Sequence, residues 1–438
     1  MHPRARRRSW RSASPTSRGT EAVATATSGD DRVECAIADE CGGCSLIGTT
    51  YSSQLEARRS RVRAELASYE RLAGVDVAAC VAAPANSRYR NRAKVAVGVE
   101  GDSLRIGLYA RGTNHIVDLA PCRVQRPAVQ AALESVRVWL EIHRLARPAG
   151  PVIYLDLRES LGGRCHITLV VGDDDLDPSA LPVDDLIERC PEIEGVAINY
   201  GSAVSSYPMG DVTRAVLGDG HFAAPAYELT GDAMWFRVPA AGFFQVAPAL
   251  LRDIHLRMFE YLISGDDVAA GVLDLYCGVG VHGLAIAGIA HERDASREYR
   301  LVGIEASGAA VDAAQNNAAR LGVDARFVAD RVDDVLEDVL HDLPAKFFDD
   351  RSAPAVILNP GRAGCRRAVL DALIAYRPMR VAYLSCDPRT LARDLDVLAE
   401  AGAGLRAVIP YDLMPQTDHV ETLALIELPA ARPSATSE

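Results

Sequence analysis

The sequence lacks any apolar run long enough to cross a lipid bilayer, and its start lacks the apolar block of a secretory signal. The first residues, "MHPRARRRSWRSASPTSRGTEAVATATSGDD", contain arginines with no hydrophobic stretch behind them. These absences argue against a membrane protein and against secretion. We therefore expect a cytoplasmic protein in which residues 1–33 form a disordered basic tail.

The chain also lacks an excess of basic residues. It has 47 Lys and Arg against 59 Asp and Glu, which gives a formal net charge of -12 over 438 residues. This balance argues weakly against a nucleic-acid partner, but a basic groove can exist on an acidic protein. The length and the 49% hydrophobic content indicate a globular chain of two or three domains.

Cysteine is well represented, with ten residues in a chain that has no signal peptide. Such a chain favours metal ligation, catalysis or burial over a disulfide framework. In "VECAIADECGGCSL", Cys35, Cys41 and Cys44 form a C-x5-C-x2-C array, and Cys122 in "DLAPCRVQ" is a candidate fourth ligand. Four thiolates suit zinc or an iron–sulfur cluster. Because zinc sites more often have two C-x2-C pairs, this single pair favours a 4Fe–4S cluster, although spacing alone does not choose the metal. We assign the following cysteines to packing or chance: Cys80, Cys165, Cys190, Cys277 and Cys365.

Two regions with different strand patterns follow the cysteine array. Residues 34–240 combine runs such as "CHITLVVG" with the helix-like "AVQAALESVRVWLEIHRL", which predicts a mostly antiparallel α+β central domain. In residues 241–430 strands alternate with helices, the pattern of a parallel α/β sheet covered by helices. Residues 431–438 are expected to form a flexible C-terminus.

One strand of the central region has a basic face in its sequence pattern. In "SRYRNRAKVAVGV", Arg88, Arg90, Arg92 and Lys94 alternate with Tyr89 and apolar residues. A solvated strand face is the usual outcome of such alternation. In an acidic chain, this concentration of cations is also a candidate for contact with nucleic-acid phosphates.

A glycine motif opens the second region. "GVLDLYCGVGVHGLAIAGIA" contains Gly278, Gly280 and Gly283 in a G-x-G-x-x-G pattern between a strand and a helix, and the next strand ends at Glu305. The glycines let the backbone approach an adenosine ligand, and the acid accepts hydrogen bonds from ribose hydroxyls. The motif does not separate a nicotinamide dinucleotide from S-adenosylmethionine. An NAD-dependent oxidoreductase therefore stays open at this point.

Four further motifs help to decide between a nicotinamide dinucleotide and S-adenosylmethionine as the ligand. "GFFQV", "NPGRAG", "YLSCDPRTLARDL" and "PQTDHVETLALIE" occur in this order along the chain. With the glycine motif and the cysteine array, they resemble the bacterial RNA uracil-5 methyltransferases over roughly residues 35–428. That family uses S-adenosylmethionine to make 5-methyluridine in ribosomal or transfer RNA. The resemblance implies a class I Rossmann-like methyltransferase domain, preceded by an α+β domain with an iron–sulfur cluster.

The resemblance also implies residue roles. Cys386 matches the nucleophile that adds to carbon 6 of uracil, and Glu421 matches the base that removes the proton from carbon 5. The residues that match the S-adenosylmethionine-binding set are Gln245, Tyr276, Glu305, Asp330 and Asn359. The residues that match the ligands of a 4Fe–4S cluster are Cys35, Cys41, Cys44 and Cys122.

The partner expected from the resemblance is RNA, with 23S ribosomal RNA favoured over transfer RNA, bound by a monomer that does not contact membranes. The cluster belongs to the ribosomal-RNA branch, and Asn359 stands where many members have aspartate. Val281 and Ala247 stand where asparagine is usual. Because of these two departures, an alternative hypothesis is an RNA-binding protein with a degraded methyltransferase site.

Overall fold

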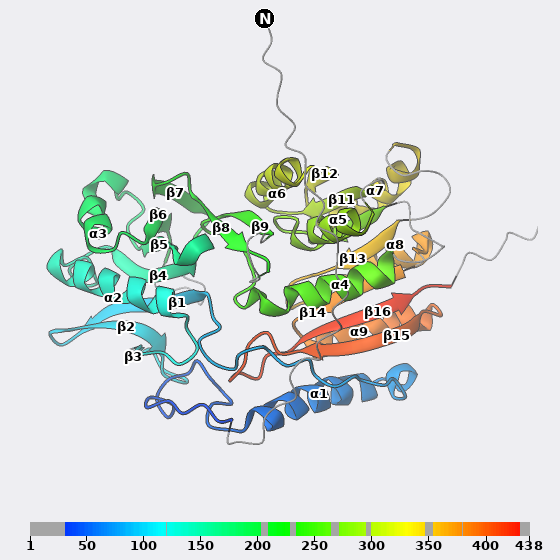
Figure 1. Cartoon of the computed structure of the whole chain (residues 1–438), viewed down its shortest axis with the longest axis horizontal. Helices are drawn as coiled ribbons and strands as arrows, with labels where there is room; N and C mark the ends of the chain where they lie inside the picture. Colours follow the sequence, from blue (N-terminus) through cyan, green and yellow to red (C-terminus); the bar gives the residue numbers. More distant parts are fainter. Residues whose placement is uncertain are drawn as a thin grey trace, which may run out of the picture. The chain divides into compact units, whose positions relative to one another are not determined.

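Figure 1 shows the protein as a computed structural model. The described residues are 31–119, 121–202, 209–227, 234–263, 271–294, 299–346, 354–378 and 380–429. The expected basic tail and the expected flexible C-terminus lie almost wholly outside these ranges. None of the helices within them is both long enough and apolar enough to traverse a bilayer.

The central region forms a seven-stranded sheet in the order β3-β2-β1-β4-β5-β6-β7. Its strands are β1 (Arg92–Glu100), β2 (Ser103–Tyr109), β3 (Ile116–Asp118), β4 (Val152–Glu159), β5 (Cys165–Val171), β6 (Ile193–Tyr200) and β7 (Val212–Leu217). In the described part of this sheet, neighbouring strands run antiparallel except β5 and β6, which are parallel. The predicted α+β, mostly antiparallel character is confirmed.

Helices α2 (Pro127–Ile142) and α3 (Val183–Arg189) cover one face of this sheet. Trp139 of α2 is fully buried, and its indole Nε1 donates to the Pro182 carbonyl at 2.9 Å. Alternate residues of the strands, such as Val95 and Leu155, pack beneath these helices because successive side chains in a strand point to opposite faces. The first core therefore lies between this sheet and its two helices.

The second region forms another seven-stranded sheet in the order β12-β11-β10-β13-β14-β16-β15. Its strands are β10 (Val272–Leu275), β11 (Arg300–Glu305), β12 (Asp324–Ala329), β13 (Ala355–Leu358), β14 (Arg380–Ser385), β15 (Gly404–Tyr411) and β16 (Glu421–Glu427). The first five strands in this order pair in parallel, whereas β16 pairs antiparallel with β14 and β15. The predicted parallel α/β sheet is confirmed, with an antiparallel edge.

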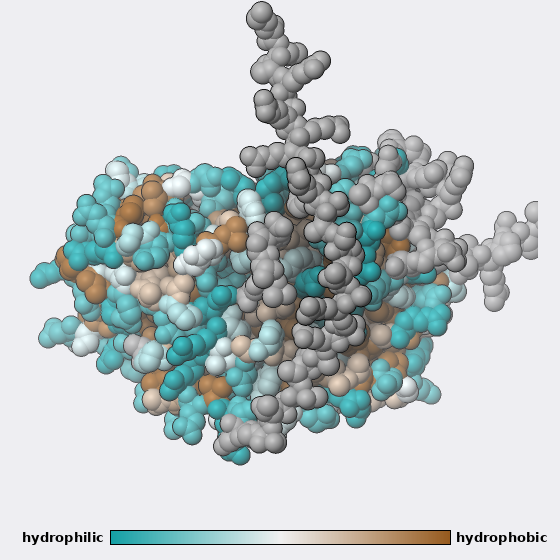
Figure 2. All heavy atoms as spheres, in the orientation of Figure 1, coloured by the Kyte–Doolittle hydropathy of each residue, from teal (hydrophilic) through white to brown (hydrophobic). Residues whose placement is uncertain are grey.

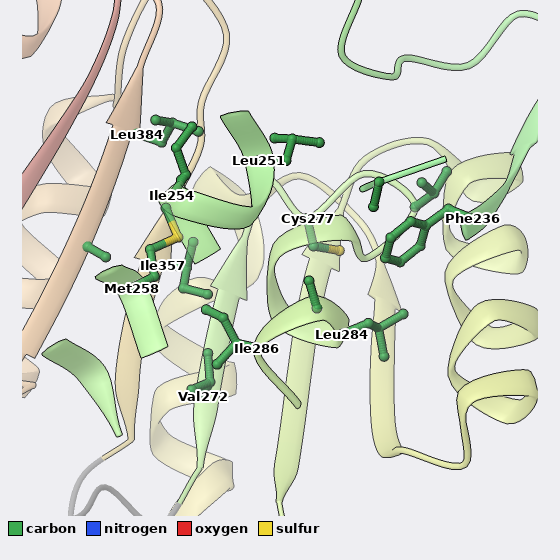
Figure 3. Packing of buried hydrophobic residues seen from close by; sticks show 14 of the residues in the cluster. Phe236, Leu251, Ile254, Met258, Val272, Cys277, Leu284, Ile286, Ile357 and Leu384 are labelled. Atoms are coloured by element: carbon green, nitrogen blue, oxygen red, sulfur yellow. The ribbon is translucent and has the colours of Figure 1, made fainter. Parts of the chain in front are cut away.

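Helices cover both faces of the second sheet. On one face lie α4 (Leu251–Leu262), α5 (Val281–Arg293) and α6 (Gly308–Leu321), and Figure 3 shows Leu251, Ile254 and Met258 of α4 together with Ile357 of β13 and Leu384 of β14. On the other face lie α1 (Tyr51–Ala67), α7 (Val332–Lys346), α8 (Arg367–Tyr376) and α9 (Pro388–Glu400). Every residue of β10 and β13 is buried, as expected for strands with both faces covered.

Helix α1 precedes the first sheet in sequence but packs on the second one. Val62 and Leu66 lie in the same buried cluster as the residues of α9. The guanidinium of Arg58 forms an ion pair with Asp412 at 3.0 Å, and both side chains are almost completely buried. Gln54 and Gln416 exchange two hydrogen bonds, each 3.0 Å long. These contacts attach α1 to the segment between β15 and β16.

A two-stranded hairpin, β8 (His221–Pro225) and β9 (Trp235–Pro239), contributes Phe236 to the buried cluster that also contains residues of α5 and α6 (Figure 3). On the face shown in Figure 2, hydrophobic residues form separate small patches among hydrophilic ones. The exposed large hydrophobic residues include Phe243, which is 66% exposed in the "GFFQV" segment.

The expected basic strand face is wrong in part. Strand β1 begins at Arg92, so Arg88 and Arg90 precede it, and Arg88 has a positive φ of 50°. Arg92 donates two hydrogen bonds, 2.8 and 2.7 Å long, to the fully buried carboxylate of Asp156. A guanidinium held by a buried partner is not available for a phosphate. Arg88 is exposed and remains a candidate contact.

Candidate active site

Except for Gln245, the predicted catalytic and cofactor residues lie along one edge of the second sheet. Tyr276, Asp330, Asn359 and Cys386 each directly follow a parallel strand, and Glu305 is the last residue of its strand. The carboxyl ends of parallel strands meet at the same edge, where open α/β sheets bind their ligands. Glu421 reaches this edge from the other direction, because it begins a strand antiparallel to β14.

The ladder between β14 and β16 brings Cys386 and Glu421 together. Ser385 is paired with Thr422, so the next residue of β14 and the preceding residue of β16 are Cys386 and Glu421. We call these two residues the catalytic pair. The charge of Glu421 contributes to the raised pKa of the Cys386 thiol, which is consistent with their proximity.

Glu421 has the protonation behaviour of a base that works near neutral pH. Its side chain is 6% exposed, and burial raises the pKa of Glu421 to about 7 although the Arg362 guanidinium lowers it. A catalytic base is most effective when its pKa lies near the working pH. The carboxylate can therefore accept a proton from a bound substrate and release it again.

Cys386 is half-buried at the start of α9. Burial and then the carboxylate of Glu421 raise the pKa of the thiol, while Arg362 lowers it. Asp387 is the N-cap of α9 and accepts from the backbone amides of Arg389 at 2.9 Å and Thr390 at 3.2 Å. The N-terminus of a helix and a nearby guanidinium both favour a thiolate.

Arg362 was not among the residues predicted from the sequence. It is exposed in the "NPGRAG" loop, and its charge acts on both members of the catalytic pair. The loop is fixed from α9: Thr390 donates to the Arg362 carbonyl at 3.1 Å, and Arg393 donates to the carbonyls of Ala363 and Cys365 at 2.9 and 3.0 Å. The sequence signal was the arginine after Asn359-Pro360, four residues past a buried strand.

The glycine turn has the shape that an adenosine ligand requires. Gly278 and Gly280 have φ angles of 56° and 82°, in the left-handed region that favours glycine. A Cβ atom added to Gly278 would meet nothing within 4 Å, so the backbone there faces open space. The Gly278 amide donates to Glu305 Oε2 at 3.1 Å, which holds the acid of β11 beside the turn. Tyr276 also has a positive φ, 62°.

The three other predicted cofactor residues have no hydrogen bond to the glycine turn among the described residues. Asp330 is exposed, and its backbone amide donates to the Glu305 carbonyl at 3.1 Å. Asn359 is half-buried, and its amide group contacts His282 of α5 at 3.0 Å. Gln245 is half-buried in the loop after β9, where its carbonyl accepts from Asn91 at 3.4 Å. Each of them remains a prediction as a ligand of the cofactor.

The four predicted cluster cysteines line one small pocket. Cys35, Cys41, Cys44 and Cys122 surround it together with apolar residues that include Ile37 and Val124. Burial and the three neighbouring thiols raise the pKa of Cys44 to about 12. The Gly43 amide donates to Cys41 Sγ at 3.4 Å. A thiol-lined, apolar pocket fits an iron–sulfur cluster by its donor atoms.

In the described ranges, no group of three or more His, Cys, Asp or Glu side chains has the arrangement expected around a single metal ion. The thiols nevertheless share one pocket. A cluster of four irons holds its cysteine ligands further apart than a single ion does, so the shared lining is compatible with such a cluster. All ten cysteines are free thiols, and the packing assignments include Cys165, Cys190, Cys277 and Cys365, which are buried.

The chain is similar to known RNA-modifying enzymes. Residues 214–428 match the family described as tRNA (Uracil-5-)-methyltransferase. An uncharacterized RNA methyltransferase of Gloeobacter violaceus is 32% identical over 406 residues, which cover 90% of this chain and 82% of the relative. A second such protein, from Thermosynechococcus vestitus, is 31% identical over 402 residues, which cover 90% of this chain and 84% of the relative.

A solved structure shares the fold. The Pyrococcus abyssi tRNA (uracil-54, C5)-methyltransferase, in complex with S-adenosyl-L-homocysteine, superposes with a TM-score of 0.66 at 23% identity. The match covers 88% of this chain and 86% of that one. The similarity therefore extends over both sheets rather than over the second alone.

A Rossmann-like RNA methyltransferase is the class of protein that this fold and these relatives define. The chain belongs to the RNA (uracil-5-)-methyltransferase family, and the reaction of the enzyme depends on S-adenosylmethionine. This membership decides against the NAD-dependent oxidoreductase. It also favours an active enzyme over an RNA-binding protein with a degraded site.

Proposed function

We propose that the protein methylates carbon 5 of a uridine in 23S ribosomal RNA through a covalent adduct at Cys386. The observation that carries this proposal is the ladder register that makes Cys386 and Glu421 neighbours at the ligand-binding edge of the sheet. A nucleophile and a base with a pKa of about 7 then face the same substrate position.

The nucleophile is needed because carbon 5 of uracil reacts weakly with electrophiles. Addition of the Cys386 thiolate to carbon 6 moves electron density to carbon 5 and makes it nucleophilic. The Arg362 guanidinium lowers the pKa of the thiol and so increases the thiolate fraction. When bound, S-adenosylmethionine supplies the methyl group.

The base completes the reaction. After methylation, carbon 5 carries both the methyl group and its original proton, and the bond between Cys386 and carbon 6 breaks only when that proton leaves. The Glu421 carboxylate takes the proton, and the electron pair of the bond between carbon 5 and that hydrogen forms the double bond between carbons 5 and 6. The sulfur of Cys386 leaves as a thiolate with the electron pair of its bond to carbon 6. Water outside the site then accepts the proton from Glu421.

The cofactor is held at the glycine turn in this proposal. Glu305 lies beside Gly278 and is the acid for the ribose hydroxyls. The remaining proposed contacts come from Gln245, Tyr276, Asp330 and Asn359. Ala247 is buried against Tyr89 and Val124, so in this proposal it packs there and does not contact the cofactor.

The four cysteines of the thiol-lined pocket hold a 4Fe–4S cluster in this proposal. Such a cluster would tie the segment 35–44 to Cys122 and so fix loops that neighbour Arg90 and Arg111, whose charges act on these thiols. The ribosomal target is supported by the same cysteines, because the resemblance associates them with the ribosomal-RNA branch. Transfer RNA is the competing substrate, as the name of the matched family indicates.

The proposal is tested with purified enzyme, 23S ribosomal RNA and transfer RNA, all lacking 5-methyluridine. Cys386→Ala should abolish methylation and leave S-adenosylmethionine binding intact. Glu421→Gln should allow methylation but stall release, and so trap a methylated protein–RNA adduct on a denaturing gel. The matched control is Cys80→Ala, at a half-buried cysteine outside both sites.

Methylation of transfer RNA alone would contradict the proposed ribosomal target but not the proposed covalent mechanism. Wild-type rates in Cys386→Ala would overturn the chemistry itself. Mapping 5-methyluridine in RNA from cells that lack the gene identifies the modified nucleotide.

A further inference from the structure

A chain of polar side chains, buried at its centre and half-buried at its two ends, runs from the hairpin region to the active-site edge. Tyr227 contacts His255 at 2.9 Å, His255 contacts His282 at 2.9 Å, and His282 contacts Asn359 at 3.0 Å. His255 lies on α4 and His282 on α5, and their rings meet edge to face with centroids 5.1 Å apart. The last member of the chain, Asn359, is one of the proposed cofactor residues.

The surroundings of this chain are apolar. His255 is 0% exposed and His282 is 3% exposed. The residues on either side of them, including Ile254 and Leu284 in Figure 3, belong to the core cluster between α4, α5 and the second sheet. Burial lowers the pKa of His282 to about 4 and lowers that of His255 well below its ordinary value. Both rings are therefore neutral, with one N–H donor and one acceptor each.

Because both rings are neutral, all hydrogen bonds between these four side chains must donate in the same direction. The Nδ2 group of Asn359 is only a donor, so the His282 Nε2 that it faces must accept. His282 then carries its proton on Nδ1 and donates to His255 Nε2. His255 in turn carries its proton on Nδ1 and donates to the Tyr227 hydroxyl oxygen. Each hydrogen bond thus fixes the next.

We propose that Tyr227, His255 and His282 are positioning residues that hold the Asn359 amide with its carbonyl oxygen directed to the bound ligands. In this orientation Oδ1 accepts a hydrogen bond from an N–H group. Among the described residues, no hydrogen bond to that oxygen is present. The donor is either the ammonium group of S-adenosylmethionine or the N3–H group of the target uracil. The inference rests on the proposed role of Asn359 at this site.

The asparagine at this position sets the direction of the hydrogen bonds. Asn359 stands where many members of the family have aspartate, and an aspartate carboxylate would accept from His282 Nε2 and so reverse every hydrogen bond along the chain. An asparagine amide can donate to His282 and keep its oxygen for the ligand.

The first test locates the ring protons in the free protein. Nitrogen-15 NMR of labelled histidine at about pH 7 should place the protons of His255 and His282 on Nδ1, with no imidazolium form. A proton on His282 Nε2 would overturn the proposal, because Asn359 would then direct its NH2 group to the ligand. This measurement needs no substrate, so its outcome is independent of whether the protein methylates uridine.

The second test separates positioning from packing at His282. His282→Phe fills the space without a hydrogen-bonding group and leaves the buried Nε2 of His255 without its donor, so thermal stability should fall. His282→Gln retains an amide acceptor towards Asn359 and a donor towards His255. The Phe variant should lose about tenfold or more in either cofactor affinity or KM for RNA, and the Gln variant should recover most of the loss.

Tyr227→Phe removes the hydroxyl at the far end of the hydrogen-bonded chain. It should weaken cofactor affinity or raise KM for RNA several-fold, whichever of the two His282→Phe changes. Its matched control is Tyr261→Phe, which removes a buried hydroxyl that has no partner in the described structure. A change in calorimetric S-adenosylmethionine affinity would assign the donor to the cofactor, and a change in KM for RNA alone would assign it to uracil. If His282→Phe alters neither quantity, the proposal is wrong.

Discussion

The burial of Glu421 predicts that Glu421→Gln stabilises the folded protein above neutral pH. Burial raises the pKa of this carboxyl to about 7 from an ordinary value of 4.5. One pKa unit corresponds to about 1.4 kcal/mol, so the ionised side chain destabilises the fold by about 3 kcal/mol. Glutamine has nearly the same shape and carries no charge.

The sign of the pH dependence follows from proton binding. The unfolded chain loses this proton near pH 4.5, and the folded protein loses it near pH 7. Between these values the folded state holds one more proton, so the wild-type free energy of unfolding falls as pH rises through this window and levels off above it. The advantage of Glu421→Gln should therefore be near zero at the lower end and about 3 kcal/mol at about pH 8.5.

Urea denaturation of wild type and variant at about pH 5 and about pH 8.5 measures this difference. Glu337→Gln is the matched control, because Glu337 is an exposed carboxylate on α7. It should change the free energy of unfolding by less than about 0.5 kcal/mol at either pH. Equal stability of wild type and Glu421→Gln at about pH 8.5 would refute the reasoning. The same substitution removes the proposed base, so stability and turnover should change in opposite directions.

Arg362→Ala should raise the pKa of both members of the catalytic pair, so methylation should fall at neutral pH and recover as pH rises, whereas the exposed Arg389→Ala should leave the pH–rate profile in place. Protein purified without oxygen should be brown and contain about four irons per chain, and Cys41→Ala but not Cys80→Ala should lower the iron content; stoichiometric zinc without iron would exclude the cluster. Arg92→Ala should destabilise the fold by roughly 1–3 kcal/mol in urea titrations, because the buried Asp156 carboxylate loses one of its two arginine partners. It should also change RNA affinity less than Arg88→Ala does, and a larger effect of Arg92→Ala on RNA affinity would identify Arg92 as an RNA contact.

The parallel sheet and its site could be predicted because local signals mark both. Buried strands that end in a glycine turn, in Glu305, in Asn359 and in Cys386 predict residues gathered at one edge. Glu421 was predicted from the family resemblance, and the antiparallel return of β16 explains how it reaches the same edge. The assignment of most other cysteines to packing followed from composition and is confirmed by their burial.

Other features depend on contacts between distant segments and have no local signal. His255 and His282 lie on different helices, and nothing in either helix indicates that the two rings meet. Arg92 has the alternating pattern of a solvated strand, but its partner Asp156 lies on β4, 64 residues away. Arg362 could have been found, because it directly follows the Asn-Pro-Gly turn at a strand end. The boundary predicted near residue 240 remains a prediction.

The docking of α1 has a consequence for expressing or recombining parts of this protein. A fragment that starts at residue 241 would include every strand of the second sheet but would lack Val62 and Leu66, which cover α9. It would also lack Arg58, and Asp412 would be left as a buried charge without its partner. Glu421 follows Asp412 by nine residues in the same connection. The genetic unit needed for a working catalytic half is therefore discontinuous, and a chimaera joined near residue 240 should keep α1 from the same parent as β15 and β16.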